Sequence, residues 1–377
     1  MTSTVARIDQ KLPPPLRGVL VVGLIYVFLV GVSSLEAGIK VMGADTQERL
    51  FSAVTNPIAG LSIGILGTVL VQSSSASTSV IVGLVATGQL GVADAVPMVM
   101  GANIGTTVTN TLVSLGHVRR STEFKRAFAA ATVHDFFNVL AVALLLPLEL
   151  AFGAVSEPAK WMSERLVGAS GSDWKSPVKE WVKEPVNWVK DFWGQFSSGN
   201  VEGTLVVLTG LVIILLALTL ITKNMRKLVA ERIEQSVNTL LGKGGGAVAL
   251  LLGLVITVAV QSSSITTSIL IPLSAAGVLS LRNAYPVTLG ANVGTTITAL
   301  LAALAASSPD SLTVGLAHTT FNVLGILALY VLPFFREVPI RLAEGLADIA
   351  IERRPLALAY VLIMFIVAPL VGVALFR

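Results

Sequence analysis

The sequence predicts an all-α integral membrane protein with two inverted-topology repeats, each containing a re-entrant helical hairpin and a broken transmembrane helix. Composition gives the class, because 54% of the 377 residues are hydrophobic and only 13% are charged, with a mean hydropathy of +0.81. A soluble domain carries about 25% charged residues. The repeat is visible directly: Thr68 to Thr109 matches the segment 189 residues later at 22 of 42 positions without a gap.

The apolar segments locate the membrane helices, since about 20 residues cross the bilayer. We expect single spans at 18–40, 94–116, 127–150, 201–222, 283–304, 313–335 and 355–376. The apolar segments 57–89 and 244–278 are too long for one span, and each carries Gln-Ser-Ser-Ser near its middle. Each is therefore predicted to form two half-length helices that meet at the serines and enter and leave on one side.

The positions of the basic residues support these hairpins. With a cytoplasmic N-terminus, the loops 117–126, 223–243 and 336–354 all lie in the cytoplasm, where positively charged loops are retained. If both hairpin segments crossed fully, the first two of these loops would lie opposite the basic N-terminus. We therefore expect a multi-pass protein of the cell (inner or plasma) membrane. A cleaved signal peptide is the alternative reading of the N-terminal segment, but its long apolar run favours an uncleaved span.

This topology divides the chain into four parts. They are a first repeat (1–155, hairpin 57–89), an extracytoplasmic loop (156–200), a second repeat (201–335, hairpin 244–278), and a cytoplasmic loop with a final helix (336–377).

The extracytoplasmic loop holds all five tryptophans. Three of them recur every seven residues, and other apolar side chains share that helical face: Trp174, Trp181, Trp188, Val178, Val182 and Phe192. This pattern predicts an amphipathic helix on the outer membrane surface, broken near Pro185. An aromatic substrate-binding site is the less favoured interpretation. Residues 231–241 are expected to form a similar short helix on the inner side.

The Gln-Ser-Ser-Ser clusters are the strongest candidates for ligand contact. Serine and threonine in membrane helices usually bond to a carbonyl one turn back or pack between helices. Three consecutive hydroxyls point in different directions, which packing does not require. A broken helix does require them, because its freed amides and carbonyls need partners. We expect substrate contacts from these clusters and from one threonine in each half: Gln72, Ser73, Ser74, Ser75, Thr106, Gln261, Ser262, Ser263, Ser264 and Thr295.

Cation contacts are expected from neutral oxygens and one acid. The segments from Gly101 to Thr107 and from Gly290 to Thr296 repeat Gly-Ala-Asn-x-Gly-Thr-Thr. They lack the lysine of a phosphate-binding loop, although close helix packing at Gly101 and Gly105 remains an alternative. Intramembrane acids are functional by default. The predicted sodium ligands are Gln72, Ser75, Thr78, Asn103, Thr107, Asp135, Gln261, Ser264, Thr267, Asn292 and Thr296.

No catalytic group is expected in this chain. A serine hydrolase is disfavoured because no base is placed beside Ser74 or Ser263. His134 and His318 are expected to form hydrogen bonds between helices and not to bind a metal, since no other ligand sits at metal spacing. We also expect no organic cofactor and no nucleic acid partner. Helix N-termini and co-bound cations can together neutralise an anion, which favours symport.

These motifs resemble the type II sodium-dependent phosphate cotransporter family. The resemblance rests on the two Gln-Ser-Ser-Ser runs, the two Gly-Ala-Asn-x-Gly-Thr segments, and the motifs around His134 to Asn138 and His318 to Asn322. It implies inorganic phosphate as substrate and sodium as driving ion, and the chain length is similar to that of bacterial members. An acid at the position of Asp135 implies an additional sodium ion and electrogenic transport. The alternative function is symport of a dicarboxylate or sulfate, and the third possible function is that of an ion channel or a structural membrane protein.

Overall fold

The computed structural model describes residues 13–42, 56–167, 177–242, 245–306 and 308–376, and within these ranges all regular structure is helical. Six of the described helices are long and apolar enough to cross a membrane: Pro14–Val41, Ser121–Phe152, Gly199–Met225, Leu281–Ala306, Pro309–Val331 and Arg354–Phe376. The prediction of an all-α membrane protein is confirmed.

The first half contains two long helices, a pair of half-length helices, and a helix interrupted once. Its elements are α2 (Pro14–Val41), α4 (Pro57–Val71), α5 (Ser74–Ala86), α6 (Val92–Thr106), α7 (Val108–Leu115) and α8 (Ser121–Phe152). The interruption between α6 and α7 lies at Thr107, whose amide bonds to the Ile104 carbonyl at 3.2 Å, one residue short of the regular helical bond. The residues that follow are β-branched or polar and favour a helix weakly.

The second half repeats this order with one difference. Its elements are α11 (Gly199–Gly242), α12 (Gly246–Val260), α13 (Ser263–Ala275), α14 (Leu281–Ala306), α15 (Pro309–Ile326) and the π-helix η2 (Leu327–Val331). α14 is continuous, so the predicted broken helix is wrong for this half. The alanine- and leucine-rich sequence after Thr296 favours a helix strongly. α11 also continues to Gly242, and so includes the segment 223–242, expected to be a loop with a short helix at 231–241.

The remaining helices are α9 (Ser156–Val167), α10 (Pro177–Gly194), α16 (Pro333–Glu352), α17 (Arg354–Leu362), the π-helix η3 (Ile363–Val367) and α18 (Ala368–Phe376). The segment expected to be the loop 336–354 is therefore largely the helix α16.

α10 differs from its prediction in two ways. It continues through Pro185 without a break, because Val182 and Val186 on both sides of the proline are buried in the protein core. Val182 therefore does not share a face with Trp181 and Trp188, which are 66% and 68% exposed. Trp174 lies outside the described residues, and the side chain of Val178 is not described.

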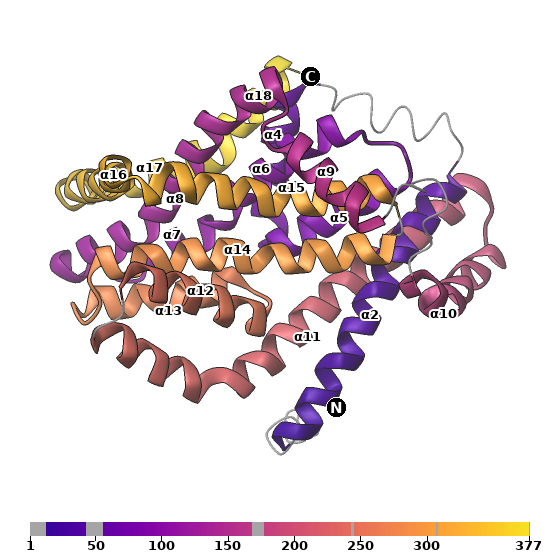
Figure 1. The fold of residues 1–377 in the computed structure, drawn as a ribbon, viewed down its shortest axis with the longest axis horizontal. Coiled ribbons are helices and arrows are strands. Elements are labelled where there is room, and N and C mark those ends of the chain that lie inside the picture. The colour runs from indigo at the N-terminus through magenta and orange to yellow at the C-terminus, as the bar shows by residue number, and fades with distance from the viewer. Residues whose placement is uncertain (1–12, 43–55, 168–176, 243–244, 307, 377) are drawn as a thin grey trace.

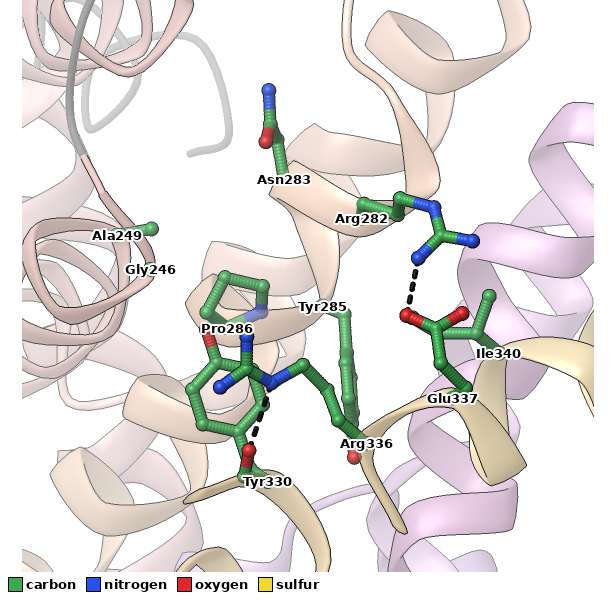
Figure 2. A pocket seen from close by; sticks show the side chains of 10 residues that line it. All are labelled: Gly246, Ala249, Arg282, Asn283, Tyr285, Pro286, Tyr330, Arg336, Glu337 and Ile340. Atoms are coloured by element: carbon green, nitrogen blue, oxygen red, sulfur yellow. Dashed lines mark hydrogen bonds and ion pairs between the residues drawn. The ribbon is translucent and has the colours of Figure 1, made fainter. Parts of the chain in front are cut away.

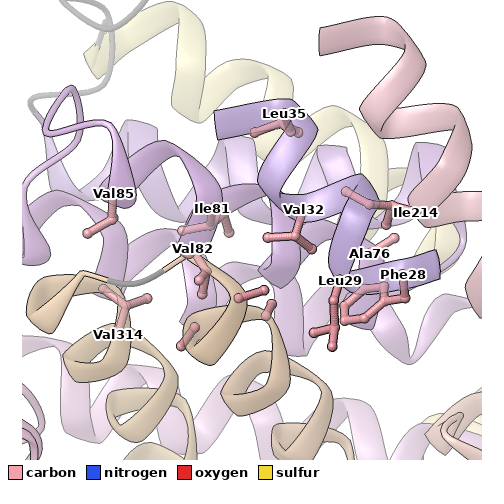
Figure 3. Close-up of a cluster of buried hydrophobic side chains, with 14 of the residues drawn as sticks. Phe28, Leu29, Val32, Leu35, Ala76, Ile81, Val82, Val85, Ile214 and Val314 are labelled. Atoms are coloured by element: carbon pink, nitrogen blue, oxygen red, sulfur yellow. The ribbon is translucent and has the colours of Figure 1, made fainter. Parts of the chain in front are cut away.

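The largest hydrophobic core joins the two halves. Figure 3 shows Val82 of α5 beside Val314 of α15, with Phe28 and Val32 of α2 and Ile214 of α11 in the same cluster. In Figure 1 the long helices α14 and α15 run side by side through the molecule, and the two are in contact. Because α5 packs on helices of the second half, each half completes the core of the other.

The contacts at the two ends of the molecule agree with the predicted topology. At one end, Ser311 donates to the Val82 carbonyl at 3.1 Å and Ser163 donates to the Pro309 carbonyl at 3.1 Å. All four residues are predicted to lie near the outer surface. At the other end, predicted cytoplasmic residues meet in the ion pairs Lys125–Asp348 and Arg282–Glu337. The orientation of these ends in a membrane stays a prediction.

Candidate functional site

Both hairpin tips break at a glutamine in the left-handed conformation. Gln72 (φ 56°, ψ 27°) ends α4, and Gln261 (φ 56°, ψ 29°) ends α12. This backbone conformation costs a residue with a side chain about 1 kcal/mol or more. The side-chain amides offset part of that cost, since Gln72 Nε2 donates to the Val69 carbonyl at 2.5 Å and Gln261 Nε2 donates to the Val258 carbonyl at 2.6 Å. The predicted break of both hairpins at the serines is confirmed.

A threonine also holds each glutamine from outside the hairpin. The Thr109 hydroxyl donates to Gln72 Oε1 at 3.1 Å, and the Thr298 hydroxyl donates to Gln261 Oε1 at 2.8 Å. The side-chain nitrogen and oxygen of each glutamine therefore both form hydrogen bonds that hold the tip in its conformation.

The serines that follow begin the second helix of each hairpin. Ser73 and Ser262 are N-caps, and their hydroxyls accept hydrogen bonds from Ala76 N at 3.2 Å and Ile265 N at 3.4 Å. The next hydroxyls, those of Ser74, Ser75, Ser263 and Ser264, have no hydrogen-bond partner within the described part of the chain. Free amides and the positive end of the helix dipole lie at the same place. Each tip therefore presents hydroxyls and amides suited to an anion.

The threonines near the tips donate to backbone carbonyls one turn back. Thr78 donates to the Ser74 carbonyl at 2.8 Å, and Thr267 donates to the Ser263 carbonyl at 2.8 Å. The threonines of the two Gly-Ala-Asn-x-Gly-Thr-Thr segments also donate to backbone carbonyls about one turn back. They form two equivalent pairs, Thr106 with Thr295 and Thr107 with Thr296. These hydroxyl oxygens keep lone pairs, so they can still accept a cation.

The helix α7 connects the two hairpins. Thr109 contacts Gln72 at the first tip, while the adjacent Asn110 bonds to Thr267 Oγ1 at 2.7 Å and accepts from Ser268 Oγ at 3.0 Å in α13. In addition, α13 packs on α7 and α8, and α5 packs on α14 and α15. The second helix of each hairpin thus lies against the opposite half, and α7 contacts both hairpins near their serines.

The motif asparagines form a network between the halves. Asn103 Nδ2 donates to Asn322 Oδ1 at 2.8 Å, and Asn103 Oδ1 lies 3.2 Å from His318 Nε2. Asn292 makes the equivalent contacts across the other half, with Asn138 Oδ1 at 2.8 Å and His134 Nε2 at 2.6 Å. The predicted role of the two histidines in hydrogen bonds between helices is confirmed. The side chains of Asn103 and Asn292 are hydrogen-bonded in this network, and each Oδ1 keeps a second lone pair that can accept a cation. Their role as sodium ligands stays a prediction.

Asp135 lies in a separate polar cluster. Its carboxylate is fully buried, and Oδ2 accepts hydrogen bonds from Thr111 Oγ1 at 3.1 Å and from Tyr360 Oη at 3.0 Å. Oδ1 has no hydrogen-bond partner among the described residues. A buried, half-satisfied carboxylate has free capacity for a cation.

The sequence analysis does not predict several of these residues. Thr109 and Thr298 occupy equivalent positions in the repeat, and Asn138 and Asn322 end the repeated motifs that begin at His134 and His318. Their recurrence in both halves is a sequence signal that indicates a shared role. Asn110 and Tyr360 have no such signal, because neither has a matching residue in the other half.

One cavity lies apart from these residues. Figure 2 shows it at the start of α12 and α14, with a volume of about 170 Å³ and a lining that includes Arg282, Tyr285, Arg336 and Glu337. Arg282 pairs with Glu337, and Arg336 Nε donates to the Tyr330 carbonyl at 2.9 Å. None of the predicted site residues lines this cavity.

Comparison with known proteins gives the family. A family model described as Na+/Pi-cotransporter matches residues 27–166 and 213–337. Sodium-dependent phosphate transport protein 2B of Homo sapiens is 34% identical, in a match covering 94% of this chain and 64% of that protein. Sodium-dependent phosphate transport protein 2A of Rattus norvegicus is 34% identical, covering 98% of this chain and 68% of that protein. The chain thus spans about two thirds of the length of these relatives, and no solved structure matches it. From these matches, the chain belongs to the Na+/Pi-cotransporter family.

Proposed function

We propose that the chain is a secondary active transporter that couples the entry of sodium to the import of inorganic phosphate. One observation carries this proposal: two hairpin tips begin helices with unpartnered serine hydroxyls, and α7 links both tips. The relatives named as sodium-dependent phosphate transport proteins supply the identity of the ions.

Phosphate is held in this proposal by helix N-termini and not by basic side chains. No charged residue occurs between Pro57 and Ala93 or between Gly245 and Leu281. The anion therefore depends on the amides and hydroxyls at the start of α5 and α13, centred on Ser74 and Ser263. Gln72 and Gln261 shape the tips and position these serines.

Sodium supplies the remaining positive charge. Hydroxyl and carbonyl oxygens suit this hard cation, and the tips offer them at Ser75, Thr78, Ser264 and Thr267. Each bound sodium lowers the electrostatic cost of the phosphate, and each bound phosphate favours sodium by the same factor. That reciprocity couples the two ions without a catalytic step.

The membrane arrangement belongs to the same proposal. We assign 1–155 and 201–335 to inverted repeats, 156–200 to the outer surface, and the N-terminus and most of 336–354 to the cytoplasm. The protein lies in the cell (inner or plasma) membrane. The hairpins then enter from opposite sides, as in transporters built from inverted-topology repeats.

Uptake of labelled phosphate into proteoliposomes tests the function. An inward sodium gradient should drive saturable uptake that arsenate inhibits, while a potassium gradient should not. Ser263→Ala should raise the apparent KM for phosphate or sodium. The matched control is Ser274→Ala in the same helix, because Ser274 Oγ is buried without a hydrogen-bond partner among the described residues and lies near the other end of α13. Phosphate uptake that does not depend on the sodium gradient, or a preference for sulfate or a dicarboxylate over phosphate, would contradict the proposal.

Asp135 makes the transport electrogenic in this proposal. Its unpartnered Oδ1 is the place for an additional sodium ion. Asp135→Gly should abolish the transport current and leave some phosphate uptake, because one positive charge per cycle is lost. The charge moved per phosphate should be measured in voltage-clamped membranes. An unchanged ratio of charge to phosphate would show that Asp135 does not bind sodium.

A further inference from the structure

A groove lies between α2 and α10, at the end of the molecule that we assign to the outer surface. Its volume is about 250 Å³, and its charged lining consists of Lys40, Lys179, Lys183, Lys190, Glu36 and Glu180. The four ammonium groups outnumber the two carboxylates, so the groove carries an excess of positive charge.

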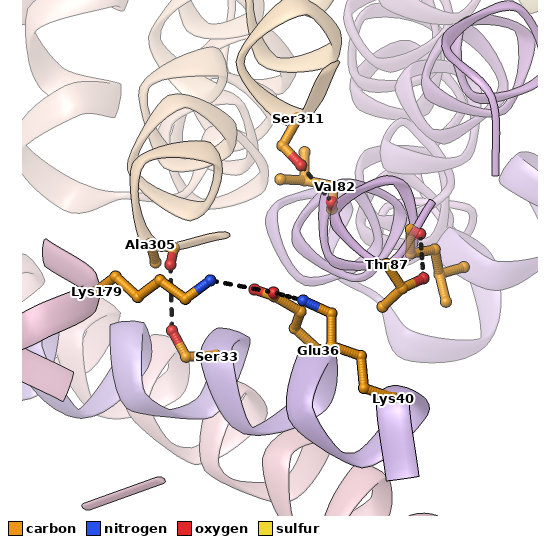
Figure 4. A network of polar contacts seen from close by, with 9 residues as sticks. Ser33, Glu36, Lys40, Val82, Thr87, Lys179, Ala305 and Ser311 are labelled. Carbon is orange, nitrogen blue, oxygen red and sulfur yellow. Dashed lines mark hydrogen bonds and ion pairs between the residues drawn. The ribbon is translucent and has the colours of Figure 1, made fainter. Parts of the chain in front are cut away.

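One carboxylate is already neutralised at the floor of the groove. Glu36 is 5% exposed, and Oε1 accepts from Lys40 Nζ at 2.5 Å and lies 3.7 Å from Lys179 Nζ. Figure 4 shows Lys40 and Lys179 reaching Glu36 from opposite sides, one from α2 and one from α10. Glu36 therefore cannot offset the other lysines.

The other two lysines have no ion-pair partner within the described residues. On α10, Lys183 lies four residues after Lys179, and Lys190 lies seven residues after Lys183. All three line the groove. Lys179 and Lys183 are one turn apart, and like charges at that spacing destabilise a helix. An anion held between them would remove that repulsion.

The helix that carries these lysines is fixed in place. Val182 and Val186 of α10 are buried in the core, and Tyr26 Oη of α2 donates to the Trp181 carbonyl at 2.8 Å. The ammonium groups are therefore attached to a positioned scaffold and not to a free loop, which lowers the ordering cost of binding.

We propose that this groove binds a phosphate-bearing anion, supplied either by inorganic phosphate in solution or by the headgroup of an anionic phospholipid. Neither hairpin lines the groove, so binding here requires no sodium. A cationic groove concentrates free anions near the protein, while the exposed Trp181 and Trp188 beside it suit a lipid surface. The inference goes beyond sodium-coupled transport and does not depend on it.

The full chain, purified in detergent and free of sodium, tests the proposal in two arms. Binding of potassium phosphate is measured by calorimetry, and retention of phosphatidylglycerol is measured by native mass spectrometry. The K183Q/K190Q double variant should weaken binding in at least one arm by about 20-fold, since a lysine near an anionic surface contributes about fivefold. K183R/K190R should retain binding because it keeps the charge.

The matched control is Lys160→Gln in α9, an exposed lysine assigned to the same side but outside the groove. Loss in the phosphate arm identifies free phosphate as the ligand, and loss in the lipid arm identifies the headgroup. Unchanged binding by K183Q/K190Q in both arms, or an equal loss in K160Q, would show only a solvated cationic surface and overturn the proposal. A wild-type chain that binds here but does not take up phosphate would refute the transport function alone.

Discussion

At the residue scale, the two glutamines at the hairpin tips show how a strained backbone is maintained. Among the described residues other than glycine, only Gln72 and Gln261 have positive φ. Each makes one hydrogen bond within its hairpin and one to a threonine in a neighbouring helix. Strain of this kind persists where surrounding contacts determine it, often at functional sites.

Substitutions at Gln261 separate the strain from the contacts. Gln261→Ala loses both side-chain hydrogen bonds and keeps the left-handed strain, whereas Gln261→Gly loses the bonds but removes the strain. The glycine variant should be more stable than the alanine variant by about 1 kcal/mol, measured as thermal unfolding in one detergent. Both should transport more slowly than wild type. An alanine variant as stable as the glycine variant would show that the tip relaxes to another conformation.

Tyr360 is a positioning residue for the predicted sodium carboxylate. Its hydroxyl donates to Asp135 Oδ2, and a hydrogen bond to a charged group contributes about 1.5–3 kcal/mol. Tyr360→Phe should therefore lower the apparent sodium affinity of transport by about tenfold, with protein abundance and the phosphate KM at saturating sodium little changed.

Tyr26→Phe is the matched control for Tyr360→Phe, because it also removes one hydroxyl hydrogen bond but lies on α2 and bonds to the Trp181 carbonyl. Equal shifts in sodium affinity from both substitutions would assign the effect to general destabilisation.

At the element scale, the first helix of each hairpin packs backbone to backbone on the next helix. A Cβ at Gly64 would meet the Met98 carbonyl, and one at Gly101 would meet the Leu61 carbonyl. In the second half, a Cβ at Gly253 of α12 would likewise meet a carbonyl of α14, and one at Gly290 of α14 would meet a carbonyl of α12. The close-packing alternative for Gly101 is thus confirmed, which explains part of the motif without any ligand.

Two glycines in α4 test this packing within one helix. Gly64→Ala should destabilise the protein by about 2 kcal/mol or more, since α4 and α6 must separate. Gly67→Ala meets no atom within 4 Å and should stabilise by about 1 kcal/mol through helix propensity. Unfolding temperatures of the purified variants report both changes. A stability change of the same sign in both variants would contradict the close approach of these helices.

At the scale of the whole molecule, the sequence predicts the symmetric features well and the asymmetric ones poorly. The breaks at Gln72 and Gln261 follow from polar clusters in the middle of apolar runs, and the sequence predicts both. It does not predict the continuity of α14, because matching motifs do not fix whether the residues after them propagate a helix. The contact of Tyr360 with Asp135 joins residues 225 positions apart, and nothing in the local sequence around either residue indicates it. The network that uses Asn103 and Asn292 likewise appears only when the two halves are assembled.

The inverted arrangement can be tested on this chain directly, because it contains no cysteine. Gln89 and Val278 are equivalent in the repeat, each near the open end of its hairpin. The first should face outward and the second the cytoplasm. In intact cells, Gln89→Cys should react with a membrane-impermeant maleimide, whereas Val278→Cys should react only after permeabilisation. Lys160→Cys and Arg119→Cys serve as outer and inner controls, since both side chains are exposed and predicted on opposite sides. Labelling of both hairpin positions from the same side would make the repeats parallel, and the two serine tips would then approach the membrane centre together from one side instead of from both.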